Sequence, residues 1–227
     1  MFVDIFGQPA KPLNPVRVKG AAIELDLSNI AKYMWIGRAD MTWYEEVENV
    51  IVSIFGRAEL LRFARILAAT SIHSTLKSNL SQARRAKVQL DTGAAIEGYL
   101  PNVKANLELI RQGKDLSGQK IRKFANAIAG DKDAVVVDIW ILRAFGQDRK
   151  YVRSANMKPL SGGATDRQYS IIEKWIQENA RIMGLQPRQF CAMIWSGVRQ
   201  VHTGRGNTTR YQELLMEQYK PKNKFNF

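Results

Sequence analysis

A glycine-containing turn near the middle of the chain carries the residue types that bind an anion. Gly113 and Gly118 border a short turn, and the segment after it begins with the basic residues Lys120, Arg122 and Lys123. A glycine turn at the start of a helix leaves backbone N–H groups open, and the helix dipole adds partial positive charge there. The pattern indicates a phosphate-binding turn, although many helix pairs have similar turns and bind nothing.

A single carboxylate stands between an apolar run and the start of a helix. Asp138 follows three valines at 135–137, and apolar residues at helical spacing continue over 139–145. Aspartate is favoured at a helix N-cap, where it accepts backbone N–H groups and adds about 1 kcal/mol of stability. From composition and spacing alone, a cap is the expected role of Asp138.

The remaining reactive side chains are few. With one cysteine and two histidines the chain has no zinc or iron–sulfur ligand set and cannot form an intramolecular disulfide, so we expect no metal and no cofactor. Cys191 lies in the apolar run 190–195 and is predicted to be a buried structural thiol. His202 is predicted to lie at the end of a helix. Three tryptophans at apolar helical positions are predicted to be core, although one aromatic side chain could line a binding pocket: Trp140, Trp175 and Trp195.

The charge of the chain indicates a polyanionic partner. Its 227 residues include 34 Lys and Arg against 21 Asp and Glu, a formal net charge of +13. Such an excess attracts nucleic acid and speeds its encounter with the protein. A hydrophobic fraction of 45% is that of a globular protein, and no apolar run is long enough to cross a membrane. We therefore expect a cytoplasmic protein that binds nucleic acid and no membrane.

Helix start and stop signals follow one another along most of the chain. We expect an extended arm over 1–22, a helical domain over 23–219 and a basic tail over 220–227. Thr42 with Glu45 three residues later forms a capping box, and Thr165 or Asp166 caps a later helix. No alternating strand pattern of useful length occurs, so the predicted fold class is all-α with about nine helices. They are expected over 42–56, 59–69, 74–90, 101–113, the ten or so residues before Gly130, 139–145, 166–183, about fifteen residues from Pro187, and 208–219.

The order of motifs over 101–146 resembles the helix-hairpin-helix superfamily of base-excision DNA glycosylases. The resemblance is carried by the Leu116–Lys120 turn, the helix after it, the valines with Asp138, and the pair Phe145-Gly146. In that family a hairpin, here 101–130, grips the DNA backbone, and an aspartate after an apolar run is the catalytic carboxylate. The resemblance implies a two-lobed helical domain with the DNA between its lobes and Asp138 facing the cleft.

Further residues take their roles from the same resemblance. Bifunctional members carry a lysine early in the second hairpin helix that attacks the sugar, and Lys120 matches it; a rival alignment gives this role to Lys123. The segment 67–74 resembles the helix–loop–helix whose residue fills the vacated base stack, which would be His73. The resemblance implies DNA contacts at Gly118, Ser117, Lys114, Arg122, Lys123 and His73. Ser117 stands where the family turn has proline, and no cysteine cluster follows, which excludes the iron–sulfur branch.

Together these features predict a DNA glycosylase that hydrolyses the N-glycosidic bond of a damaged or modified base in double-stranded DNA. The segment 192–195, Ala-Met-Ile-Trp, is similar to a pattern in divergent phage and prokaryotic members, so modified phage DNA is one candidate substrate. The alternative is a DNA-binding protein that keeps the hairpin without the chemistry. A third hypothesis is a basic helical protein that binds RNA or serves assembly. No obligate protein partner is predicted.

Overall fold

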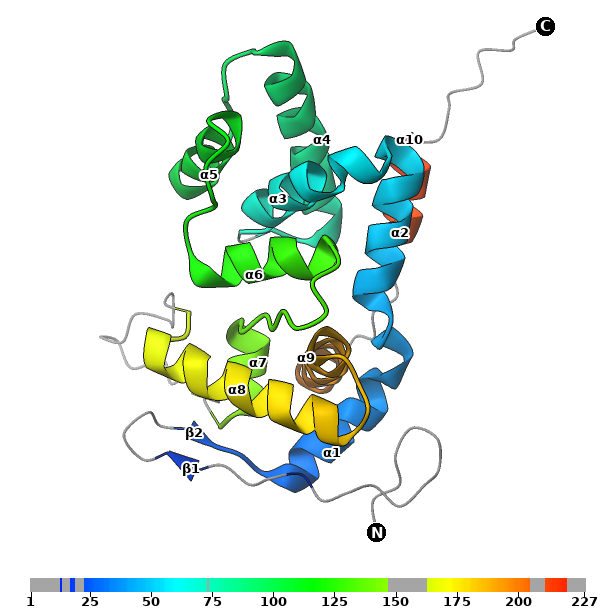
Figure 1. Cartoon of the computed structure of the whole chain (residues 1–227), viewed down its shortest axis with the longest axis vertical. Coiled ribbons are helices and arrows are strands. Elements are labelled where there is room, and N and C mark those ends of the chain that lie inside the picture. The colour runs from blue at the N-terminus through cyan, green and yellow to red at the C-terminus, as the bar shows by residue number, and fades with distance from the viewer. Residues whose placement is uncertain are drawn as a thin grey trace, which may run out of the picture. The chain divides into compact units, whose positions relative to one another are not determined.

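Helices make up most of the described chain, which confirms the mostly helical fold class predicted from the sequence. The structure, a computed structural model, describes residues 13, 17–18, 23–72, 74–146, 163–204 and 211–219. The helices are α1 (Leu27–Gly37), α2 (Trp43–Phe55), α3 (Leu60–Thr70), α4 (Leu76–Thr92), α5 (Pro101–Arg111), α6 (Gln119–Ile128), α7 (Ile139–Ala144), α8 (Asp166–Ile182), α9 (Pro187–Thr203) and α10 (Tyr211–Tyr219) (Figure 1). Two short 3₁₀ helices, η2 (Arg38–Asp40) and η3 (Arg57–Glu59), precede α2 and α3. The strands β1 (Arg17–Val18) and β2 (Ile23–Glu24) form an antiparallel pair.

The chain divides into two compact units. Unit 1 comprises residues 1–44 and 131–207, and unit 2 comprises 45–130 and 208–227. Unit 1 therefore contains α1, α7, α8 and α9, whereas unit 2 contains α3 to α6 and α10. The predicted two-lobed arrangement and the cleft remain predictions.

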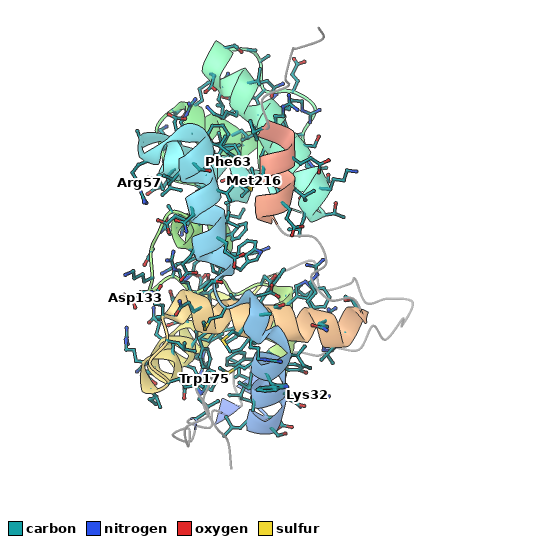
Figure 2. All side chains as sticks on the ribbon, turned by 90° about the vertical axis from the view of Figure 1, so that its right-hand side faces the viewer. Lys32, Arg57, Phe63, Asp133, Trp175 and Met216 are labelled. Carbon is teal, nitrogen blue, oxygen red and sulfur yellow. The ribbon has the colours of Figure 1, made fainter. Side chains whose placement is uncertain are left out.

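In unit 1, α9 contacts each of the other three helices. It meets α1 at two glycines, where a side chain would not fit: a Cβ at Gly37 would overlap the carbonyl oxygen of Met193, and one at Gly197 would overlap that of Tyr33. The absence of side chains lets the two helix backbones touch. Trp175 lies on α8 (Figure 2). Its ring packs edge-on against those of Phe145 and Phe190, with ring centroids 5.2 and 5.9 Å away.

In unit 2, α3 contacts α4, α5 and α6. Its side chains Phe63, Ile66 and Leu67 are almost completely buried. Phe63 lies near α10, whose Tyr219 ring is 6.4 Å from it, while Met216 on the same helix is exposed (Figure 2). Through this contact α10, which follows unit 1 in the sequence, packs as part of unit 2.

Most of the expected helix boundaries agree with the structure to within a few residues. Thr165 caps α8 with a complete capping box, and α2 begins directly after Thr42. The sequence analysis missed α1, although Asp26 gives it an N-cap by accepting the backbone N–H groups of Ser28 and Asn29. Most of the arm predicted over 1–22, all of the tail over 220–227 and most of the loop predicted over 147–165 lie outside the described residues.

Candidate functional site

Asp138 caps α7 at the point where the chain leaves a buried segment. Residues 134–137 are almost fully buried, and Asp138 itself is half-buried. Its Oδ1 accepts the backbone N–H of Trp140 at 2.8 Å and that of Ile141 at 3.1 Å. The predicted cap is therefore present, and it fixes one oxygen of the carboxylate at the start of the helix.

The second carboxylate oxygen has its own donor. Trp195 on α9 donates its indole Nε1–H to Asp138 Oδ2 over 2.8 Å. Trp195 was predicted to be a core side chain, and this was wrong, because it is half-buried. α9 packs against α7, and this contact brings the indole N–H to the carboxylate. Trp140 is also half-buried, whereas Trp175 is buried as predicted.

These three N–H donors hold both oxygens of Asp138 in place. In the part of the chain that the structure describes, no basic side chain forms an ion pair with this carboxylate. A carboxylate that is held at both oxygens can stabilise a positive charge that develops in front of it, and no reorganisation is then needed.

The segment before Asp138 is anchored by two buried side chains. The Tyr169 hydroxyl donates to the carbonyl of Val135 at 2.7 Å and accepts the N–H of Val137 at 3.3 Å. The Cys191 thiol lies 3.6 Å from the carbonyl oxygen of Val136 and is buried, as predicted. These contacts fix the backbone that delivers Asp138.

Burial governs the ionisation of the groups behind the carboxylate. Desolvation raises the pKa of Cys191 to about 12, and the negative charge of Asp138 adds to the effect. Burial also raises the pKa of Tyr44 and of Tyr169, with smaller contributions from Asp138 in each case. These three groups therefore stay neutral at physiological pH and have the role of packing, not of acid–base chemistry.

Aromatic rings and cations in unit 1 contact the two tryptophans that donate to Asp138. The Arg143 guanidinium lies over the Trp140 ring, 4.3 Å from its centroid, and the Arg199 guanidinium lies 5.3 Å from the centroid of Trp195. The ring of Trp43 packs against that of Trp195, with 6.4 Å between the ring centroids. His202, in the last turn of α9 as predicted, has its ring 6.4 Å from Trp140. The sequence analysis did not single out Arg143, Arg199 or Trp43.

The glycine turn predicted to bind phosphate lies in unit 2, between α5 and α6. Gly118 is the N-cap of α6 with a φ of 94°, a backbone conformation that favours glycine, and no side chain caps the helix. Buried Asn106 accepts the N–H of Ser117 at 2.7 Å, and Arg65 on α3 donates to the carbonyl of Lys114 and to Asp115. Asn106 and Arg65 thus fix the backbone of the turn. The first N–H groups of α6 are left without a side-chain acceptor.

The side chains of the predicted hairpin site differ in exposure. Lys114, Ser117, Gly118 and Lys120 are exposed, whereas Lys123 is half-buried. The exposed residue Arg122 donates from its guanidinium to the carbonyl of Leu116 at 3.0 Å, so it also supports the turn. Gly118 and these side chains, including Lys120, belong to unit 2, and Asp138 belongs to unit 1. His73 lies outside the described residues.

Comparison with known proteins gives a family but no activity. Residues 34–202 match the model of a family described as "Family of unknown function (DUF7178)". The chain therefore belongs to this family, and the matched segment runs from the end of α1 to the end of α9, including the turn at Gly118, Asp138 and Trp195. No curated protein and no solved structure matches the chain significantly. Among the described helices, none is both long enough and apolar enough to span a membrane.

Proposed function

We propose that the protein is a DNA glycosylase that hydrolyses the N-glycosidic bond of a damaged or modified base and leaves an abasic site. The observation that carries the proposal is the Asp138 carboxylate, which is held on both oxygens by N–H donors and has no ion-pair partner among the described residues. The net charge of +13 and the resemblance over residues 101–146 support the choice of DNA as substrate.

In the proposed reaction, the target base is rotated out of the duplex before its bond to C1′ can be reached. As the C1′–N bond breaks, its electron pair goes to the base and the sugar becomes an oxocarbenium-like cation. The Asp138 carboxylate stabilises this positive charge, and water adds at C1′ and loses a proton. One carboxylate is sufficient for this reaction.

The turn at Gly118 is proposed to bind the DNA backbone. Its exposed N–H groups, the start of α6 and the exposed side chains of Lys114 and Lys120 together form a positively charged surface that suits phosphate. Lys120 is also the candidate amine for strand cleavage by a Schiff base. Borohydride would trap that intermediate on DNA; loss of the crosslink in Lys120→Gln but not in Lys123→Gln would assign the nucleophile to Lys120.

The alternative is a DNA-binding protein without chemistry. It is favoured by the fact that two of the three hydrogen bonds to Asp138 are those of an ordinary helix cap. In that case Asp138 would stabilise α7 only, and its replacement would leave DNA binding unchanged.

The test of the proposal is base release by wild type and Asp138→Asn. Duplexes carrying uracil, oxidised bases, alkylated bases or modified pyrimidines of phage DNA would be incubated with each protein, and abasic sites would be revealed by alkali. We expect abasic sites with wild type only. If neither protein releases a base while both bind duplex DNA equally, the alternative function is correct.

A further inference from the structure

The two tryptophans that hold the Asp138 carboxylate each carry an arginine on a ring face. Trp140 contributes its backbone N–H and Trp195 its indole N–H to the carboxylate, at 2.8 Å each. Arg143 covers the ring of Trp140 and Arg199 lies on that of Trp195. The rings nearest the carboxylate therefore already interact with the protein's own cations.

This arrangement has a consequence for the charge of any base bound there. An aromatic ring attracts a cation through its face, and guanidinium groups keep their positive charge at every physiological pH. A base that carries a positive charge would find one face of each ring already occupied by a guanidinium. It would also be repelled by the positive charges of the two guanidinium groups on these rings. The surface around Asp138 is therefore unfavourable to a cationic base.

The same cations favour a base that leaves as an anion. A purine alkylated at ring nitrogen N3 or N7 is positively charged while attached to the sugar and leaves as a neutral molecule. A neutral base keeps the electron pair of the broken C1′–N bond, leaves as an anion and then takes a proton from solvent. A guanidinium group near the base would stabilise that anion while charge develops on it. Asp138 then stabilises the sugar and the arginines stabilise the base.

We propose that the site selects bases that are neutral while attached and leave as anions, such as deaminated, oxidised or 5-substituted pyrimidines, and that it rejects cationic alkylated purines. Arg143 and Arg199 are the residues that set this selectivity. The inference rests on the proposed glycosylase function and narrows its substrate class.

The first experiment compares the two classes directly. Wild type is incubated with duplexes containing uracil or 5-hydroxymethyluracil, and separately with duplex DNA containing 7-methylguanine. We expect release of at least one neutral pyrimidine and no release of the methylated purine. Release of 7-methylguanine alone would overturn the inference and leave the glycosylase function standing. Release of neither class, together with no release from the wider panel described above, would remove both the inference and the glycosylase function.

The second experiment tests the arginines through the leaving group. A more acidic base needs less help to leave, so Arg143→Gln and Arg199→Gln should slow the release of 5-fluorouracil less than that of uracil. We expect each variant to slow uracil release about tenfold or more under single-turnover conditions, in line with the loss of one charged donor. Lys174→Gln, on the exposed surface of α8, is the control of equal charge change and should leave both rates unchanged.

A structural role for the arginines predicts a different result. Misfolding or general loosening would slow all bases by the same factor, and the melting temperature would fall. Equal slowing of 5-fluorouracil and uracil in both arginine variants would therefore overturn the assignment of Arg143 and Arg199.

Discussion

At the scale of single residues, Asp138 has two hydrogen-bond-accepting oxygens, whereas asparagine, its neutral analogue, has only one. Each of its oxygens accepts hydrogen bonds, from backbone N–H groups on one side and from the Trp195 indole on the other. An asparagine amide has one acceptor and one donor group, so in either orientation it turns an N–H toward another N–H donor. The substitution that removes the charge therefore also disturbs the structure, and the two effects must be separated.

A double-mutant cycle separates them. We predict that Asp138→Asn lowers the free energy of unfolding by about 1–3 kcal/mol, because one donor loses its acceptor. Trp195→Phe removes the indole donor. This substitution should therefore lower the free energy of unfolding less in the Asp138→Asn variant than in wild type. Urea unfolding of the four proteins measures the coupling. Additive losses would show that the indole and the carboxylate do not interact.

Cys191 provides a second prediction about residues. Because burial raises the pKa of its thiol to about 12, only about one thiol in ten thousand is ionised at pH 8. We expect Ellman's reagent to react with the native protein far more slowly than with the protein in guanidinium chloride at that pH. The unfolded thiol ionises near its ordinary pKa of about 8.5, so its contribution to stability is complete below that pH and is lost as the pH rises toward 12. Fast reaction of the native thiol would contradict the buried position.

At the scale of elements, the crossing of α1 and α9 depends on two glycines. A methyl group at Gly197 would overlap the Tyr33 carbonyl, and both partners are helix backbone, which cannot move aside cheaply. We predict that Gly197→Ala lowers the free energy of unfolding by at least about 1–3 kcal/mol, the usual effect of overpacking. Gly163→Ala is the matched control, because nothing lies within 4 Å of a Cβ there. A thermal melt in which both variants unfold like wild type would contradict this packing.

The α5–α6 turn allows a prediction about DNA affinity. Lys120 is exposed, so its replacement by Gln should weaken binding to duplexes of any sequence. If it contacts one phosphate, the slope of log K against log salt concentration should decrease by about 0.9. Lys174→Gln, on α8, should leave the slope unchanged, and fluorescence anisotropy at several salt concentrations measures both. An unchanged slope for Lys120→Gln would show that this lysine contacts no phosphate.

Some helices could be predicted from the sequence, whereas contacts between distant helices could not. α2, α8 and α9 could be placed from Thr42, Thr165 and Pro187, because caps and first-turn prolines are local signals. α1 was missed despite its Asp26 cap, since only three of its residues are buried, Ile30, Met34 and Gly37, and the apolar pattern of the helix is therefore short. The Trp195 donor could not be predicted at all: it is 57 residues from Asp138 and reaches it only because α9 packs on α7.

At the scale of the whole molecule, the chain leaves unit 1 after residue 44 and re-enters it at residue 131, just before Asp138. The proposed phosphate turn thus belongs to unit 2 and the proposed catalytic carboxylate to unit 1. The net charge of +13 explains attraction to DNA without specifying a site. The chemistry assigned to the molecule depends on a single carboxylate in unit 1.

The most direct test of that assignment is single-turnover base release by wild type, Trp195→Phe, Asp138→Asn and the double variant, on the duplex to which wild type responds. We predict that Trp195→Phe keeps measurable activity, while both proteins that lack the carboxylate lose at least about a hundredfold in rate. The double variant should lose this rate as well, even though its asparagine no longer faces the indole donor. Base release by the double variant at the wild-type rate would contradict a catalytic role for the charge of Asp138.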